Sequence, residues 1–61
     1  MLKVGTIYMV KTYSDNSVTD NFNYEVLEVA MPLVRFRQFG KEIVLNVTSP
    51  AFVSAEPQTS N

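Results

Sequence analysis

Hydrophobic and polar residues alternate along most of this chain, in five stretches of period two that are separated by turn-forming residues. The first stretch (GTIYMVKTY) is rich in β-branched and aromatic residues and shows no helical periodicity, which favours a strand. The pattern predicts an all-β fold with five strands, at residues 5–13, 22–30, 33–39, 42–48 and 52–56. We expect these strands to form a single small domain over residues 1–56.

Turn chemistry separates the predicted strands. Residues 14–21 (SDNSVTDN) gather side chains that bond to nearby backbone, so we predict the longest loop there. Met31-Pro32 marks the next turn, and Gly40-Lys41 predicts a two-residue hairpin of type II′. A short turn is expected at residues 49–51, and residues 57–61 (PQTSN) are expected to form a flexible C-terminal tail.

The Gly40-Lys41 turn fixes a register for its hairpin. Phe39 would lie opposite Glu42, which sets Phe36 against Leu45 and Val34 against Val47 on an apolar face. The other face would then pair Arg37 with Val44 and Arg35 with Asn46. The residues expected in the core are Tyr8, Val10, Val34, Phe36, Ile43, Leu45 and Val47.

The second predicted strand changes face part of the way along. Tyr24 and Val26 share one parity, whereas Leu27 and Val29 share the other. A β-bulge near Val26 would explain this change and would turn Glu25 and Glu28 toward solvent together.

Composition narrows the possible functions. The 61 residues contain no His, Cys or Trp, which excludes disulfides and makes a structural zinc site untenable. A chain of this length is expected to have a free energy of unfolding of only ~3–9 kcal/mol. The net charge of −1 is unlike the basic footprint of a general nucleic-acid coater. The sequence shows neither an apolar stretch long enough for a bilayer nor a signal peptide, so we expect a cytoplasmic protein without a cofactor.

The order of these segments resembles that of the SH3-like small β-barrels. Five short strands, a long polar loop after the first, tight connections in the middle and a one-turn link before the last carry the resemblance, over residues 4–56. The resemblance implies a small five-stranded barrel. The chain departs from the peptide-binding SH3 family because it has no Trp, and it has no clear glycine-bearing KOW-type signature.

Two arginines give the best candidate binding site. Arg35 and Arg37 lie two apart on one strand and would point the same way, toward phosphate or a partner's carboxylates. The alternative is that Glu25 and Glu28 on the neighbouring strand pair with them as solvated ion pairs. The full candidate binding set is Arg35, Arg37, Phe39, Lys41, Val44 and Asn46.

A second candidate surface is apolar. Ile7, Met9, Leu33 and Val44 have the parity opposite to the expected core and could form a protein interface. The alternative is that a tightly curled barrel buries parts of both faces of its strands.

Two further groups favour ordinary structural roles. Asp15, Asn16 and Asp20 could ligate a hard cation, but turn chemistry is the better interpretation, so no metal site is expected. Tyr8, Tyr13 and Tyr24 could stack on bases, but strand aromatics more often belong to the core.

These observations predict a non-enzymatic protein-interaction module, because nucleophilic and acid–base catalysis lack a His base or a paired carboxylate. Small size and plain composition suit a bacterial or phage accessory protein that modulates a larger protein. A homodimer is a further option. The alternative function is a nucleic-acid-binding barrel that places Arg35, Arg37 and Lys41 on phosphates.

Overall fold

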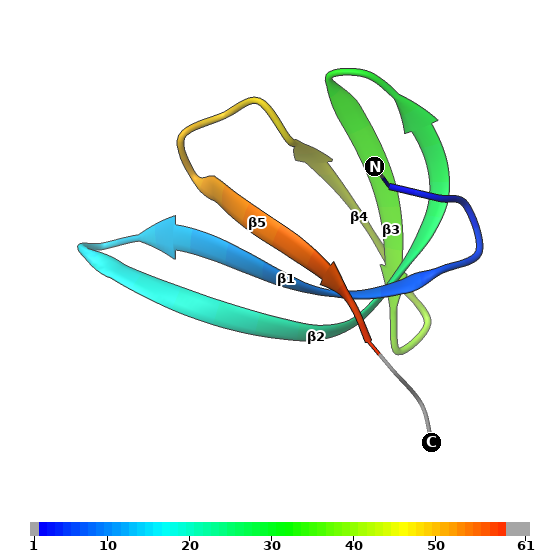
Figure 1. Ribbon diagram of the computed structural model, residues 1–61, viewed down its shortest axis with the longest axis horizontal. Helices are drawn as coiled ribbons and strands as arrows, with labels where there is room; N and C mark the ends of the chain where they lie inside the picture. Colours follow the sequence, from blue (N-terminus) through cyan, green and yellow to red (C-terminus); the bar gives the residue numbers. More distant parts are fainter. Residues whose placement is uncertain (1, 59–61) are drawn as a thin grey trace.

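The computed structural model describes residues 2–58, which form one antiparallel sheet of five strands. The strands are β1 (Ile7–Ser14), β2 (Ser17–Ala30), β3 (Leu33–Gln38), β4 (Lys41–Asn46) and β5 (Phe52–Pro57). Their order across the sheet is β4-β3-β2-β1-β5 (Figure 1). The all-β prediction with five strands is confirmed, and no helix occurs within residues 2–58. Accordingly, this part of the chain contains no helix able to cross a membrane.

The polar segment after β1 is not a long loop, which corrects the prediction for residues 14–21. Asp15 and Asn16 both have positive φ, 51° and 62°, as in a two-residue type I′ turn. β2 then begins at Ser17, and Val18 lies opposite Tyr13. The β1–β2 hairpin therefore extends beyond the rest of the sheet (Figure 1). The polar residues of this segment form a strand instead of a loop because both faces of the projecting hairpin are exposed to water, so no apolar face is required.

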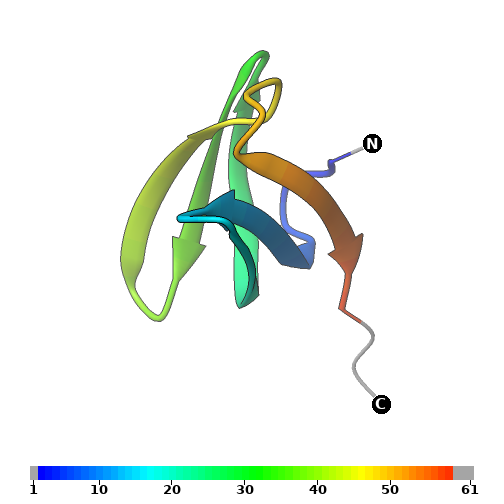
Figure 2. The ribbon, with the colours of Figure 1, turned by 90° about the vertical axis from the view of Figure 1, so that its left-hand side faces the viewer.

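The long strand β2 bends at two irregular positions. The β2–β3 pairing shifts register between Val26 and Glu28, which confirms the predicted bulge. A second shift occurs in the β1–β2 pairing between Tyr8 and Val10, beside Asn23, whose φ is 65°. These shifts bend β2, so that it pairs with β1 on one side and with β3 on the other while the sheet curves strongly (Figure 2).

The connection from β2 to β3 is the turn predicted at Met31-Pro32. Ala30 and Leu33 pair on either side of it, and the Met31–Pro32 peptide bond is cis. A cis proline is the defining feature of a type VI turn.

The register of the β3–β4 hairpin is displaced by two residues from the prediction. The turn is Phe39-Gly40, with φ of 49° and 82°, so Gln38 rather than Phe39 ends β3. Phe36 consequently lies opposite Ile43 rather than Leu45, and Arg37 opposite Glu42 rather than Val44. A shift of two residues preserves the side-chain alternation, so the predicted apolar and polar faces are retained.

The sheet is open, so the expected SH3-like barrel is not confirmed. β1 pairs with β5, but within residues 2–58 β4 and β5 are both edge strands and do not pair with each other. Residues 47–51 connect the two edges across one end of the curved sheet (Figure 2). This connection contains the predicted short turn, in which Phe52 N donates a hydrogen bond to Ser49 O (3.0 Å).

The segment expected as a tail begins in regular structure. Pro57 is the last residue of β5 and lies opposite Tyr8. Gln58 N donates to Ile7 O (2.9 Å), and the Gln58 side chain bonds to Asn23. Residues 59–61 lie outside the described part of the chain.

The buried core is small and draws on the three central strands. Within residues 2–58, the buried hydrophobic side chains are Tyr8, Val10, Tyr24, Val26, Val34 and Phe36. The Tyr24 and Phe36 rings meet at a centroid distance of 5.4 Å in a tilted arrangement. The other predicted core residues, Ile43, Leu45 and Val47, are partly buried and pack against this cluster.

Phe36→Ala should destabilise the protein by about 3–5 kcal/mol, because it removes a fully buried ring from a core with few other members. This loss is a large fraction of the expected total stability of ~3–9 kcal/mol, so the variant should unfold at a much lower urea concentration than wild type. Urea unfolding followed by circular dichroism measures the change. Phe22→Ala is the matched control, because the Phe22 side chain is exposed and its loss should change the midpoint little. Equal effects of the two substitutions would contradict the proposed location of the core.

Candidate functional site

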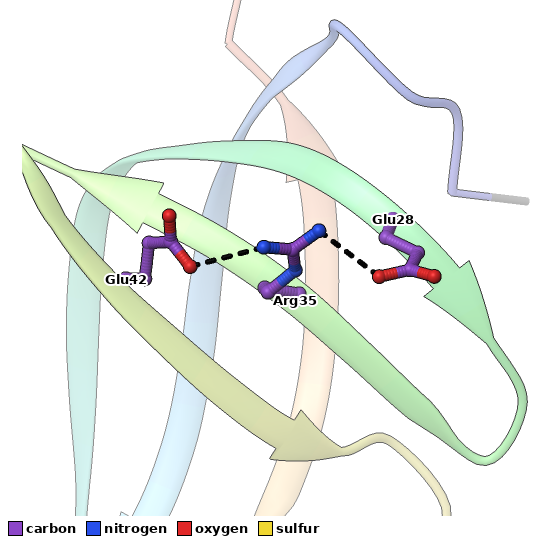
Figure 3. Close-up of polar contacts among 3 residues, drawn as sticks. All are labelled: Glu28, Arg35 and Glu42. Atoms are coloured by element: carbon purple, nitrogen blue, oxygen red, sulfur yellow. Dashed lines mark hydrogen bonds and ion pairs between the residues drawn. The ribbon is translucent and has the colours of Figure 1, made fainter.

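Arg35 lies between two carboxylates on the outer face of the sheet, opposite the core. Its Nη2 is 3.0 Å from Glu28 Oε1 on β2, and its Nη1 is 3.1 Å from Glu42 Oε1 on β4 (Figure 3). The guanidinium therefore spans three adjacent strands. Its planar fork presents a separate N–H group to each carboxylate in a geometry that is fixed in advance.

Arg37 forms a single pair on the same face. Its Nη2 is 3.1 Å from Glu25 Oε1, and the two residues are directly opposite each other on β3 and β2. The bulge between Val26 and Glu28 explains why both glutamates can face the arginines, although they lie three apart in sequence. The predicted cross-strand pairs of Glu25 and Glu28 with the arginines are thus present.

The net charge of the five ion-paired residues is slightly negative. Glu25, Glu28 and Glu42 contribute −3 and the two arginines +2, which leaves −1. All three pairs are substantially exposed to solvent, so they orient side chains more than they stabilise the fold. An anionic ligand at Arg35 would have to compete with two carboxylates that already accept hydrogen bonds from Nη1 and Nη2.

The carboxylates also change the titration of Arg35. The hydrogen bond and charge of Glu42, followed by those of Glu28, raise the pKa of the Arg35 guanidinium. A raised pKa in the folded state favours the charged form, so this contribution to stability is present at every pH below the ordinary pKa of arginine. It is lost only as the pH rises through the still higher value in the folded protein. Arg35 is therefore a permanent cation at neutral pH.

The structure separates the other predicted binding residues. Lys41 lies opposite Gln38, which puts it on the opposite face of the hairpin from Arg35 and Arg37. Phe39 is in the turn, and its side chain is 80% exposed. Asn46 shares the arginine face, but its Oδ1 accepts hydrogen bonds from Thr48 N (2.9 Å) and Thr48 Oγ1 (2.7 Å).

The predicted apolar interface residues fall into two groups. Leu33 and Val44 are exposed on β3 and β4 and line one shallow hollow with Ala30, Glu28 and Arg35. Ile7 and Met9 are on β1, where Ile7 lies opposite Glu25 and Met9 opposite Glu56. The Glu25–Arg37 pair lies between the two groups, so the four residues do not form one continuous patch.

Sequence reasoning missed two participants in this face. The predicted register places Glu42 opposite Phe39, whereas in the structure it lies opposite Arg37, and the sequence pattern predicts no role for Ala30, which lines the hollow. A test of the alternative Phe39-Gly40 turn would have brought Glu42 opposite Arg37 and beside Arg35.

The loop carboxylates show no sign of a metal site. Asp15 and Asn16 form the β1–β2 turn, whereas Asp20 lies opposite Lys11 in the ladder. Across residues 2–58, no group of three or more acidic side chains is arranged to hold a metal ion. The turn interpretation of Asp15 and Asn16 is confirmed.

Comparison of the chain with protein-family models, curated proteins and solved structures found no match.

Arg35→Lys should lower the urea midpoint at low salt, because a flexible ammonium group lacks the fixed fork that holds Glu28 and Glu42 through separate nitrogens. The difference from wild type should shrink at high salt, since salt screens exposed charges. Arg37→Lys is the matched control, because Arg37 pairs with one carboxylate and should be less sensitive. A salt-independent effect, or equal effects of the two substitutions, would show that the fork of Arg35 has no special role.

Proposed function

We propose that this chain is a non-enzymatic protein-interaction module that docks onto a larger protein through its β3–β4 surface. This surface is defined by the outer-face and turn residues Leu33, Arg35, Arg37, Phe39 and Val44. It combines exposed apolar side chains with arginines, a composition that is typical of the central part of protein interfaces.

Phe39 is the observation that carries the proposal. The residue is 80% exposed, and its backbone has φ of 49°, a conformation that bulky residues rarely adopt. The first position of a type I′ turn favours Asn, Asp or Gly. A phenylalanine there is unfavourable both for the turn and for hydration of the ring. Such a residue fits a role in binding, because unfavourable local features concentrate at functional sites.

The ion pairs support the same function in another way. Arg35 and Arg37 are already oriented by Glu25, Glu28 and Glu42, so little side-chain entropy would be lost when a partner covers them. The hollow lined by Ala30, Leu33 and Val44 offers an adjacent apolar contact. We expect the partner to bring an apolar side chain to the hollow and neutral or basic groups to its acidic border.

The relationship to SH3-like small barrels remains part of this proposal. Five antiparallel strands, a strongly curved sheet and a final strand that returns beside the first support it. The open gap between β4 and β5 and the two-residue turn after β1 differ from the expected pattern. Fold similarity of this kind does not by itself assign a partner.

Nucleic-acid binding is the competing function for the arginines. It has less support because the carboxylates leave the ion-paired cluster with a net charge of −1 and because Lys41 is on the opposite face. Phosphate contacts release counterions, so that function requires binding that weakens steeply with salt.

Phe39→Asn should abolish partner capture while making the fold more stable, by up to about 1 kcal/mol, because Asn-Gly suits a type I′ turn. The measurements are the thermal midpoint and quantitative capture of partners by the immobilised protein from a cell lysate. Val18→Asn is the control, because Val18 is also exposed but lies at the far hairpin tip. Unchanged capture by Phe39→Asn, or equal loss with Val18→Asn, would contradict docking through the β3–β4 surface.

Capture by the wild-type protein should change little between low and moderate salt if apolar contacts dominate. Binding to a mixed-sequence single-stranded RNA, measured by fluorescence anisotropy over the same salt range, is the parallel assay. RNA binding that is lost on addition of salt and on Arg35→Ala/Arg37→Ala substitution would favour the nucleic-acid function instead.

A further inference from the structure

The edge of β4 presents backbone groups that no strand within residues 2–58 pairs with. In a hairpin with a two-residue turn, the residues flanking the turn form a hydrogen-bonded pair, and such pairs alternate along the ladder. Gln38–Lys41, Phe36–Ile43 and Val34–Leu45 are therefore the bonded pairs of this hairpin. The bond from Val47 N to Pro32 O (2.9 Å) continues the same alternation. Consequently, the N–H and C=O groups of Glu42 and Val44 point away from β3, toward the open edge.

The two edges of the sheet are not equivalent. β5 ends in Pro57, which has no N–H to donate, and its pairing with β1 shifts register between Lys11 and Thr12. Prolines and bulges are the usual features that protect an edge from further pairing. β4 contains no proline, and its pairing with β3 is regular throughout. β4 is thus the edge that can accept another strand.

The sequence of β4 is suited to antiparallel pairing with a copy of itself. Its central residues, Ile43-Val44-Leu45, form an apolar triplet that is symmetric about Val44, and Val44 is 58% exposed. A two-fold axis at Val44 would set Val44 against Val44 of the second copy, and Ile43 against Leu45 of the second copy. The partly buried side chains of Ile43 and Leu45 would then cover each other on the core side.

The polar residues on either side of the apolar triplet are also compatible with this pairing. With the axis at Val44, Glu42 faces Asn46 of the second copy and not another carboxylate. Asn46 Oδ1 is occupied by Thr48, which leaves its Nδ2 to donate. Glu42 uses Oε1 for Arg35, which leaves Oε2 to accept. The two ends of the strand are therefore complementary and carry no like-charge repulsion.

We propose that the chain forms a two-fold dimer in which β4 pairs antiparallel with β4 of a second copy, centred on Val44. The sheet then continues across the axis as ten strands. The contact is one strand pair wide, so it is smaller than a standard protein interface and should form reversibly. The proposal does not depend on docking through Phe39, because Phe39 lies in the turn, outside the paired strand.

The test is the mass of the purified protein by light scattering, from about 10 μM to about 1 mM, a range that reveals weak association. The wild-type mass should rise toward twice that of the monomer. Val44→Lys should remain monomeric, because a lysine at the centre of the axis would oppose its own copy. Val53→Lys is the matched control: Val53 is 49% exposed but lies on β5, so this variant should associate like wild type.

Amide hydrogen exchange locates the contact independently. At high concentration the amides of Glu42 and Val44 should become protected at least tenfold relative to low concentration, whereas the Ala55 amide should not change. A wild-type monomer at every concentration, equal effects of the two lysine substitutions, or protection elsewhere would overturn the proposal. Phe39→Asn should still dimerise, so failure of this dimer and failure of partner docking are distinguishable.

Discussion

The whole structure depends on a very small core that is shared equally by the three central strands. β1 supplies Tyr8 and Val10, β2 supplies Tyr24 and Val26, and β3 supplies Val34 and Phe36. β2 lies in the middle, so it must pack against both neighbours while the sheet bends around the core. Its two register shifts make that bending possible. The edge strands only partly cover this cluster, which leaves their other groups available for contacts.

The same bend organises the outer face. The one-residue register shift at the bulge places Glu25 opposite Arg37 and Glu28 opposite Arg35. The tight β3–β4 turn places Glu42 opposite Arg37 and within reach of Arg35. The result is an ordered but nearly neutral set of charges beside an apolar hollow. This arrangement supports our proposal of docking onto a protein surface over the alternative of nucleic-acid binding, because the cations are already neutralised locally.

Two features of the β3–β4 hairpin favour contacts with other molecules rather than stability of the isolated chain. Phe39 exposes an aromatic ring in a backbone conformation that suits smaller residues, and β4 leaves a regular edge without the proline that protects β5. The turn and the edge are distinct parts of one hairpin. Val44 nevertheless belongs to both proposed surfaces, so a partner that fills the hollow and a second copy at the edge compete for its side chain.

The sequence by itself determined the five strands, the core face of the β3–β4 hairpin, the Met31-Pro32 turn and the bulge near Val26, because side-chain alternation and turn chemistry are local properties. Only the tertiary structure decided the length of the first hairpin, the register of the second and the open edges of the sheet. Asp15-Asn16 and Phe39-Gly40 were each compatible with several turns, and a two-residue shift leaves the alternation unchanged. The choice depends on contacts between distant residues: Phe36 against Tyr24, and Arg35 between Glu28 and Glu42.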